Sequence, residues 1–125
     1  MIRDAADTCP DYTKYAMTNA ELTDYLTPKT SAATDIITGA TVDSTVGNAI
    51  TKIGNMVFMN VGFEGVTAVS TNVLFKIPSD YRPPKNVVVS TMTNHTVNIK
   101  SDGDVLAREN INNEKIFVSA SWVTL

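Results

Sequence analysis

Residues 75 to 84 read Phe-Lys-Ile-Pro-Ser-Asp-Tyr-Arg-Pro-Pro, and they separate two stretches that are rich in valine and other strand-forming residues. Proline has no backbone N–H to donate to a neighbouring strand, and it disfavours helical geometry in the residue before it. Pro83 and Pro84 therefore cannot continue a central strand. The stretch predicts a rigid corner at which the chain crosses between two strands at the edge of a β-sandwich.

Short strand-like segments follow one another on both sides of this corner. They cover residues 55–63, 73–77, 86–91, 97–100, 105–107 and 115–125. Alternating or clustered apolar residues joined by compact polar turns are typical of antiparallel sheets. Asp102-Gly103 is a strong hairpin signal, and we expect a further turn across residues 65–71. From Ile53 onward the sequence predicts an all-β fold, an antiparallel β-sandwich of six or seven strands.

The segment 55–63 is apolar on both faces. One face carries Val57, Met59, Val61 and Phe63. Met56 and Phe58 lie on the opposite face. A strand of this kind either lies in the centre of a fold or has one sheet face covered by a partner subunit.

The region before residue 49 has a different texture, rich in Thr, Ala and Asp. Thr18 and Glu21 have the spacing of a capping box, which predicts a helix over residues 19–26 that ends before Pro28. Its apolar stripe is narrow, so the helix must pack on another element or fray. We expect residues 30–45 to form a linker or an extended neck. The chain is thus divided into a helical or extended segment, residues 1–48, and a β-sandwich domain, residues 49–125.

Two interpretations remain open for the end of this region. Apolar residues recur at spacings of four, four and three, at Val42, Val46, Ile50 and Ile53. This spacing fits one stripe of a helix, such as a short trimeric coiled neck. Their β-branched side chains, together with Gly47 and Gly54, favour extended structure instead.

Composition limits the classes of function. The chain has 125 residues and a net charge of −3, with 43% hydrophobic and 18% charged residues. This length suits one domain, and the mild acidity argues against binding to nucleic acid. No segment approaches the roughly 20 apolar residues of a membrane span. The first residues lack the apolar core of a signal peptide.

Catalytic chemistry has few candidate residues in this sequence. His95 is the only histidine, and it lies in a polar Thr-Asn-His-Thr stretch without a carboxylate nearby in sequence. We expect an exposed loop residue there rather than a member of a catalytic triad. Cys9, the only cysteine, has no intramolecular disulfide partner and is interpreted as an incidental thiol. The sequence predicts a protein that is not an enzyme.

No metal site or cofactor is expected. Asp102 and Asp104, with Asp80 or Glu109, could supply oxygens to calcium, but they lack the acidic spacing of a dedicated calcium loop. The predicted hairpin turn explains both aspartates. Trp122 lies on the apolar face of the last strand, together with Ile116, Val118 and Ala120, and we expect it in the core rather than on a sugar-stacking surface.

Three features resemble the C-terminal tip domains of bacteriophage tail fibre and baseplate receptor-binding proteins. The first is residues 52–58, Lys-Ile-Gly-Asn-Met-Val-Phe, similar to an opening strand of those tips. The second is residues 77–83, similar to their Leu-Pro-x-Gly-Tyr-Arg-Pro corner, with Asp80 where glycine is common. The third is the Asp102-Gly103 hairpin followed by a terminal strand with Ser121-Trp122. Residues 1–48 match no shaft of that family.

The resemblance implies a trimeric sandwich of jelly-roll type in the tail of a virion. Such a head binds a host cell-surface carbohydrate or cell-wall polymer without catalysis, and contacts other tail or baseplate proteins. It would be made in the host cytoplasm without a signal peptide and would not insert into a membrane. A purely structural virion subunit is the alternative, and a hydrolase of the surface polymer is disfavoured because the sequence shows no clear carboxylate pair.

Ligand contacts are expected in turns and loops. Tyr81 and Arg82 lie on the proline corner, and Asn94 and His95 lie in the polar stretch between two strands. These four residues are the candidate binding residues. Tyr81 has a second interpretation, since tyrosines at sandwich corners often close the core.

Overall fold

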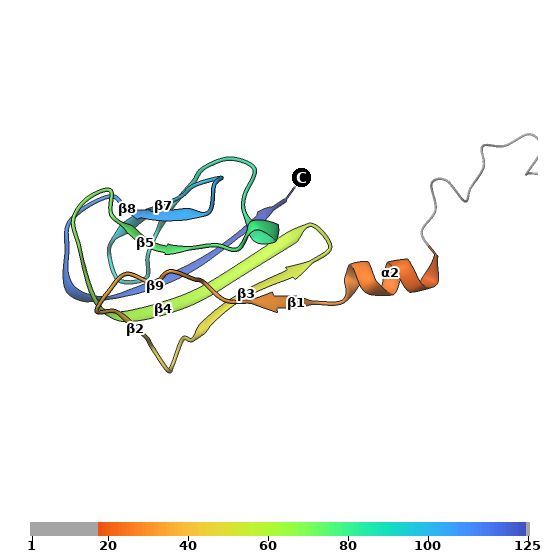
Figure 1. Cartoon of the computed structure of the whole chain (residues 1–125), viewed down its shortest axis with the longest axis horizontal. Helices are drawn as coiled ribbons and strands as arrows, with labels where there is room; N and C mark the ends of the chain where they lie inside the picture. Colours follow the sequence, from red (N-terminus) through yellow and green to blue (C-terminus); the bar gives the residue numbers. More distant parts are fainter. Residues whose placement is uncertain (1–17, 125) are drawn as a thin grey trace, which may run out of the picture.

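A computed structural model describes residues 18–124 as two antiparallel sheets that share one core, with a single helix projecting from one end (Figure 1). The helix is α2 (Asn19–Leu26), and a 3-10 turn, η2 (Ser79–Tyr81), lies at the proline corner. The strands are β1 (Lys29–Ser31), β2 (Thr41–Val42), β3 (Asn48–Ile53), β4 (Met56–Ala68), β5 (Val73–Lys76), β6 (Val87–Ser90), β7 (Thr96–Ile99), β8 (Asp104–Ala107) and β9 (Ile111–Val123). The predicted all-β sandwich is confirmed, but residues 18–124 form nine strands instead of the predicted six or seven.

The first sheet is built around the long strand β4. Strand β9 pairs with β4 from Met56 to Ala68, while β3 pairs with residues 56–61 and β2 with residues 63–64. Strand β1 pairs with β3 at the edge. All of these pairs are antiparallel.

The second sheet has the strand order β5-β8-β7-β6. The turn at Asp102-Gly103 joins β7 to β8 as predicted, and Gly103 adopts a φ of +96° there. A single bridge between Thr34 and Lys76 links the N-terminal segment to the edge of this sheet. The bridge thereby attaches the segment between β1 and β2 to the edge strand β5 of the second sheet.

The core lies between the sheets. The predicted inner face of β4, which consists of Val57, Met59, Val61 and Phe63, is at most 2% exposed. Phe63 meets Phe75 of the second sheet at a ring-centroid distance of 5.1 Å. Burial of a side chain of this size contributes roughly 1.5–3 kcal/mol. On the other face of β4, Met56 and Phe58 are 40% and 46% exposed.

The prediction of a turn across residues 65–71 is wrong for residues 65–68, because β4 continues to Ala68. The pairing of β4 with β9 shifts register between Phe63 and Val66 and again between Val66 and Ala68. Gly65 has a φ of +70°, a conformation that glycine adopts readily in a bulge. The chain bends at Gly65 without leaving the sheet.

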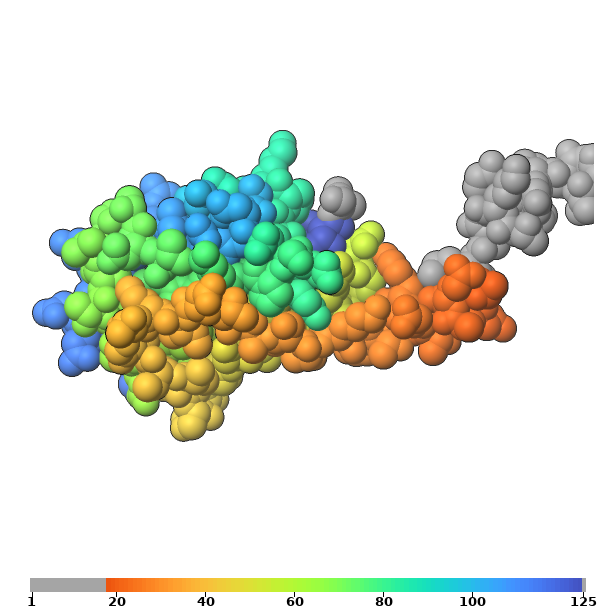
Figure 2. Space-filling view, viewed as in Figure 1, coloured from red at the N-terminus to blue at the C-terminus, as the bar shows by residue number. Residues whose placement is uncertain are grey.

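The helix forms where the capping box predicts it. Thr18 Oγ1 accepts a hydrogen bond from the Glu21 backbone N–H (3.0 Å), and the Glu21 carboxylate accepts one from the Thr18 N–H (3.3 Å). No residue of α2 is buried. The helix projects from one end of the sandwich (Figure 2).

Residues 41–53 form the strands β2 and β3 with a turn between them, so the helical interpretation of this segment is wrong. β-Branched side chains pack well on a sheet, and Gly47 adopts a φ of +86° between β2 and β3. The segment expected to be a linker is part of the sandwich. Its strands β1 and β2 pair with β3 and β4, and Ala33 is only 5% exposed. The division of the chain after residue 48 stays a prediction. Within residues 18–124, no helix has the length and hydropathy required to cross a membrane.

Candidate functional site

The proline corner is braced by hydrogen bonds from long side chains. Arg82 Nε donates to the Ile77 carbonyl (2.9 Å), so this hydrogen bond links the two ends of the corner. Trp122 Nε1 donates to the Tyr81 carbonyl (2.8 Å) and ties the corner to the end of β9. Gly103 lies directly against Arg82, where an added Cβ would be 2.4 Å from Nε. Arg82 therefore acts in this structure as a brace for the backbone.

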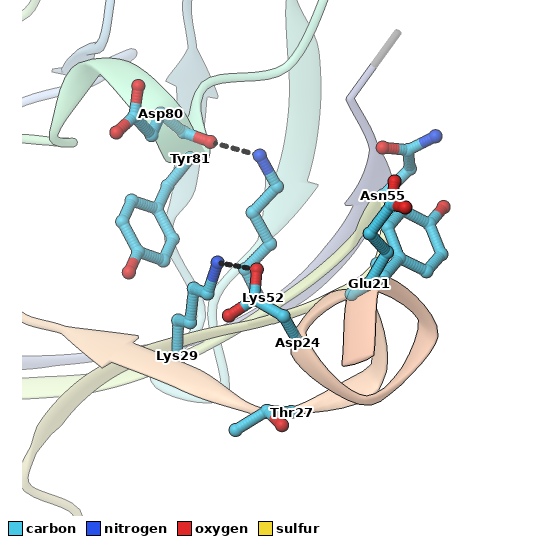
Figure 3. Close-up of a pocket in the computed structure, with 10 residues that line it drawn as sticks. Glu21, Asp24, Thr27, Lys29, Lys52, Asn55, Asp80 and Tyr81 are labelled. Carbon is cyan, nitrogen blue, oxygen red and sulfur yellow. Dashed lines mark hydrogen bonds and ion pairs between the residues drawn. The ribbon is translucent and has the colours of Figure 1, made fainter. Parts of the chain in front are cut away.

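A cleft of about 460 Å³ opens between the corner and the helix (Figure 3). One wall comes from α2 and β1, the floor from the β3–β4 hairpin, and the other wall from η2. The lining of the cleft combines two lysines, Lys29 and Lys52, with three acidic residues and several neutral polar ones, namely Glu21, Asp24, Asp80, Tyr25, Thr27, Asn55 and Tyr81. Of the four candidate binding residues, Tyr81 is the one that lines this cleft.

The helical wall is attached to the sandwich through Tyr25. Its carbonyl accepts a hydrogen bond from the Gly54 N–H (2.9 Å). Its ring lies over Gly54, so that a Cβ there would be 2.8 Å from Tyr25 Cε2. Because α2 has no buried residue, this contact largely determines how the helix sits against the hairpin.

Two lysines face each other at the base of the cleft. Lys29 and Lys52 are direct cross-strand partners in the β1–β3 pair. Lys52 Nζ donates to the Asp80 carbonyl (2.8 Å), and Lys29 Nζ is 3.5 Å from an Asp24 carboxylate oxygen. The Lys29 and Asp24 side chains are 57% and 76% exposed. Such an exposed ion pair contributes only about 0–1 kcal/mol.

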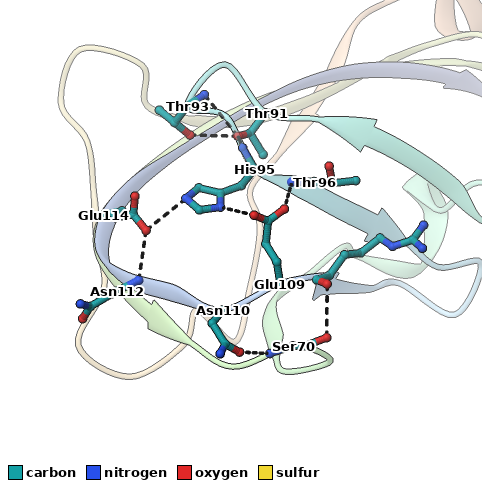
Figure 4. A network of polar contacts seen from close by, with 10 residues as sticks. Ser70, Thr91, Thr93, His95, Thr96, Glu109, Asn110, Asn112 and Glu114 are labelled. Atoms are coloured by element: carbon teal, nitrogen blue, oxygen red, sulfur yellow. Dashed lines mark hydrogen bonds and ion pairs between the residues drawn. The ribbon is translucent and has the colours of Figure 1, made fainter.

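A second polar cluster surrounds His95 in a different region (Figure 4). His95 Nε2 is 3.1 Å from Glu114 Oε2, and Nδ1 is 3.2 Å from Glu109 Oε2. The Nδ1 contact is an ion pair that does not meet the geometry of a hydrogen bond. The expectation of an exposed His95 is wrong, since its side chain is only 10% exposed. The two carboxylates come from a loop and a strand that lie more than ten residues further along the chain.

The loop around His95 is held by a threonine. Thr91 Oγ1 accepts hydrogen bonds from the backbone N–H groups of Thr93 (3.2 Å) and His95 (3.0 Å). Asn94, between them, is exposed and has a φ of +66°. Asparagine tolerates this conformation better than most residues. The loop is thus ordered and presents the Asn94 side chain outward.

The structure does not bring the four candidate binding residues together. Strand β9 connects the two regions, since Glu114 lies at the His95 cluster and Trp122 at the corner. At about 3.3 Å per residue, this part of β9 spans about 26 Å. Tyr81 and Arg82 therefore lie at one end of the sandwich, and Asn94 and His95 lie at the other.

The carboxylates raise the pKa of His95. Burial of the ring opposes protonation, but the hydrogen bond to Glu114 and the negative charge of Glu109 more than offset it, so the pKa lies above the ordinary 6.5. The pKa of Glu114 is lowered, first by a hydrogen bond from the Asn112 backbone N–H and then by His95. The protonated imidazole and the two carboxylates form a charged clasp, which joins the β6–β7 loop to Glu109 in the β8–β9 loop and to Glu114 at the start of β9.

We expect His95→Gln to cost more stability at pH 6 than at pH 9. A group whose pKa is raised on folding stabilises fully below its unfolded pKa, near 6.5, and loses this contribution as pH rises through the folded value. Thermal unfolding of both proteins at the two pH values measures the difference in midpoint. A difference that does not shrink at pH 9 would contradict the charged clasp.

The remaining candidates have structural roles. Asp104 N–H donates to Asp102 Oδ1 (3.0 Å), a hydrogen bond that lowers the pKa of Asp102 and stabilises the hairpin turn. Trp122 is 7% exposed, as expected for a core residue. Cys9 lies outside the described residues. Among residues 18–124, no group of three His, Cys, Asp or Glu side chains converges on a point where a metal ion could sit.

The interpretation of the sequence missed Tyr25, Lys29, Lys52 and Asn55 as residues of the cleft. Lys52 lies two positions after Ile50 on β3, so its side chain points to the same face of the strand as the buried Ile50. A lysine on that face is not expected from an alternating pattern. Its partner Lys29 belongs to a strand of three residues, which carries almost no periodic signal. Only the register of β1 reveals that the two lysines are opposite each other.

Comparison with solved structures finds the crystal structure of the receptor binding protein (gp15) of Listeria phage PSA, with a TM-score of 0.58 and 9% sequence identity. The likeness covers 99% of this chain and 89% of that one. No protein-family model matches the sequence, and no curated protein does. At this identity the likeness shows a common fold, and the resemblance expected from residues 52–58, 77–83 and the terminal strand is confirmed at that level.

Proposed function

We propose that the protein is a phage or prophage receptor-binding protein that acts in adsorption to a bacterial host. The observation that carries this proposal is the fold likeness to a Listeria phage receptor binding protein over nearly the whole chain. Independent support comes from the order of the strand opening, the proline corner and the tryptophan-bearing last strand in the sequence. In this role the protein belongs to the tail of a virion and contacts other tail or baseplate proteins.

The ligand in this proposal is a cell-surface carbohydrate or cell-wall polymer, bound without catalysis. The cleft beside Tyr81 supports this because it combines tyrosine rings with many hydrogen-bonding groups. His95, the one histidine of the chain, is held between two carboxylates and is poorly placed to activate a nucleophile. Arg82 braces the backbone of the corner that carries Tyr81, and Asn94 and His95 remain candidates for a separate contact at the far end.

We further propose a homotrimer that covers the outer face of the first sheet. Met56 and Phe58 on β4 and Val123 on β9 are 40–46% exposed, and Met56 and Val123 are direct cross-strand partners. Small hydroxyl side chains border these residues, for example Ser121 opposite Phe58. An apolar face with a small-residue border suits close packing against another copy.

Phe58→Asp is expected to convert the trimer to a monomer and to lower retention on cells. Three linked sites bind a repetitive surface more tightly than one by a factor of about 10²–10⁴, and this gain is lost in a monomer. Light scattering after size exclusion gives the mass, and a fluorescent fusion reports binding to a panel of bacterial strains that begins with Listeria. Val88→Asp is the matched control, because Val88 is 51% exposed on β6 of the second sheet.

Each result of this experiment has a defined meaning. A wild-type protein that is monomeric overturns the trimer. Failure of the wild type to bind any strain, or to compete with phage adsorption, overturns the receptor-binding function. It would favour the structural virion subunit, for which the exposed Leu22 and Leu26 on α2 offer a protein-binding stripe.

A further inference from the structure

The inner face of the first sheet carries an unusual row of residues at the cleft. In register across four strands lie Lys29 of β1, Lys52 of β3, Val57 of β4 and Trp122 of β9. Val57 and Trp122 are buried, as inward positions of a sandwich should be. The same face therefore changes from apolar to cationic within one row, at the point where the second sheet no longer covers it.

Two lysines directly opposite each other destabilise a strand pair, because like charges repel across the short cross-strand distance. The chain offsets this only in part. Lys52 has a neutral carbonyl partner at Asp80, and Lys29 has the exposed Asp24 carboxylate at 3.5 Å. Each ammonium group carries three donors, so both retain donors that face the cleft. An anionic ligand bound between the two ammonium groups would relieve this repulsion.

The side chains around the lysines indicate which other chemical groups the ligand carries. Figure 3 shows Tyr81 on one side of the two ammonium groups, with Asn55 and the helical wall on the other. Within residues 18–124, no hydrogen bond engages the hydroxyl of Tyr81 or of Tyr25. A tyrosine offers a ring face and a hydroxyl, and an asparagine offers both a donor and an acceptor. These groups match a ligand with several hydroxyls next to its charge.

Resting on the receptor-binding function proposed above, we propose that this cleft binds a hydroxyl-rich ligand that carries an anionic group. The anionic group lies between Lys29 and Lys52, and the hydroxylated part lies against Tyr81, Tyr25 and Asn55. A phosphate ester and a sugar carboxylate both have this chemistry. On binding, the anion competes with Asp24 for Lys29, so α2 is linked to the ligand through both Asp24 and Tyr25.

The proposal is tested by titrating the isotope-labelled full chain with glycerol 1-phosphate, glucuronate, glucose and inorganic phosphate while backbone amide NMR shifts are recorded. We expect the first or second probe to shift the amides of residues 24–29, 52–55 and 80–81 with at least tenfold higher affinity than glucose. Which of the two binds better distinguishes a phosphate from a carboxylate. If glucose binds equally well, the proposal that the ligand is anionic is overturned. If inorganic phosphate binds equally well, the proposal that the ligand is rich in hydroxyl groups is overturned.

Lys29→Met and Lys52→Met are each expected to weaken the better probe at least tenfold. Lys115→Met is the control, since it removes the same charge from a 58% exposed side chain on β9 outside the cleft. Unchanged binding by both cleft variants overturns the proposal, as does equal weakening by the control. If the wild type adsorbs to cells and the cleft variants adsorb equally well, the cleft assignment fails while the receptor-binding function stands. If the wild type adsorbs to no strain, the receptor-binding function fails, and the NMR titration still decides the chemistry of the cleft.

Discussion

Gly103→Ala is expected to destabilise the fold by about 3–5 kcal/mol, a large part of the total stability of a small domain. Gly103 has a φ of +96°, which costs a residue with a Cβ about 1–3 kcal/mol. The new Cβ would also lie 2.4 Å from Arg82 Nε and 2.7 Å from the Ile77 carbonyl oxygen. It would therefore displace the guanidinium from its hydrogen bond, which contributes about 1.5–3 kcal/mol for a charged donor.

Chemical denaturation of wild type and variant measures this effect. Gly39→Ala is the matched control, because Gly39 has a similar φ of +92° but an added Cβ there meets nothing within 4 Å. The control should lose only the cost of the backbone conformation, about 1–3 kcal/mol, without the loss of the Arg82 hydrogen bond. If the two variants lose equal stability, the contact between Gly103 and Arg82 does not brace the corner.

The Gly103 region shows which parts of the fold were predictable from sequence. The Asp-Gly hairpin is a local signal, because the turn requires a residue that tolerates positive φ. Its position against Arg82 is not local, since Gly103 follows Arg82 by 21 positions in the sequence. The sequence predicts each of the two turns but not their contact, which depends on the pairing of β5 with β8 within the second sheet.

The same distinction explains the other outcomes. The capping box at Thr18 and Glu21 is complete within four residues, and the helix was predicted with its observed bounds. The bulge at Gly65 looked like a turn, because glycine with positive φ serves both, and only pairing with β9 keeps the chain in the sheet. His95 looked exposed because its carboxylate partners, Glu109 and Glu114, approach through tertiary structure alone.

The candidate site was predicted in part for a similar reason. Tyr81 could be proposed from the corner, because turn residues project side chains into solvent. The helical wall and the lysine pair depend on the register of β1 with β3, which no pattern in a three-residue strand specifies. Arg82 was a reasonable ligand candidate by chemistry, but in the structure its Nε group is directed to the Ile77 carbonyl.

Trp122→Ala is expected to cost about 3–5 kcal/mol, the usual range for removal of a buried tryptophan. Its ring is 7% exposed, and its Nε1 donates to the Tyr81 carbonyl at 2.8 Å. Trp122→Phe keeps most of the buried area but leaves that carbonyl without its donor, so it should lose about 1–3 kcal/mol. The difference between the two variants separates packing from the hydrogen bond. Val88→Ala, at a 51% exposed position on β6 of the second sheet, should lose less than about 1 kcal/mol.

The Trp122→Phe variant also tests whether the last strand positions the cleft. The hydrogen bond fixes the backbone of Tyr81, and the Tyr81 side chain forms the wall opposite α2. We therefore expect this variant to remain folded and trimeric while its affinity for the better anionic probe falls several-fold. An unchanged affinity, together with the expected loss of stability, would show that Tyr81 is held in place by the rest of the corner, through Arg82 and Gly103, and that the terminal strand contributes to the core alone.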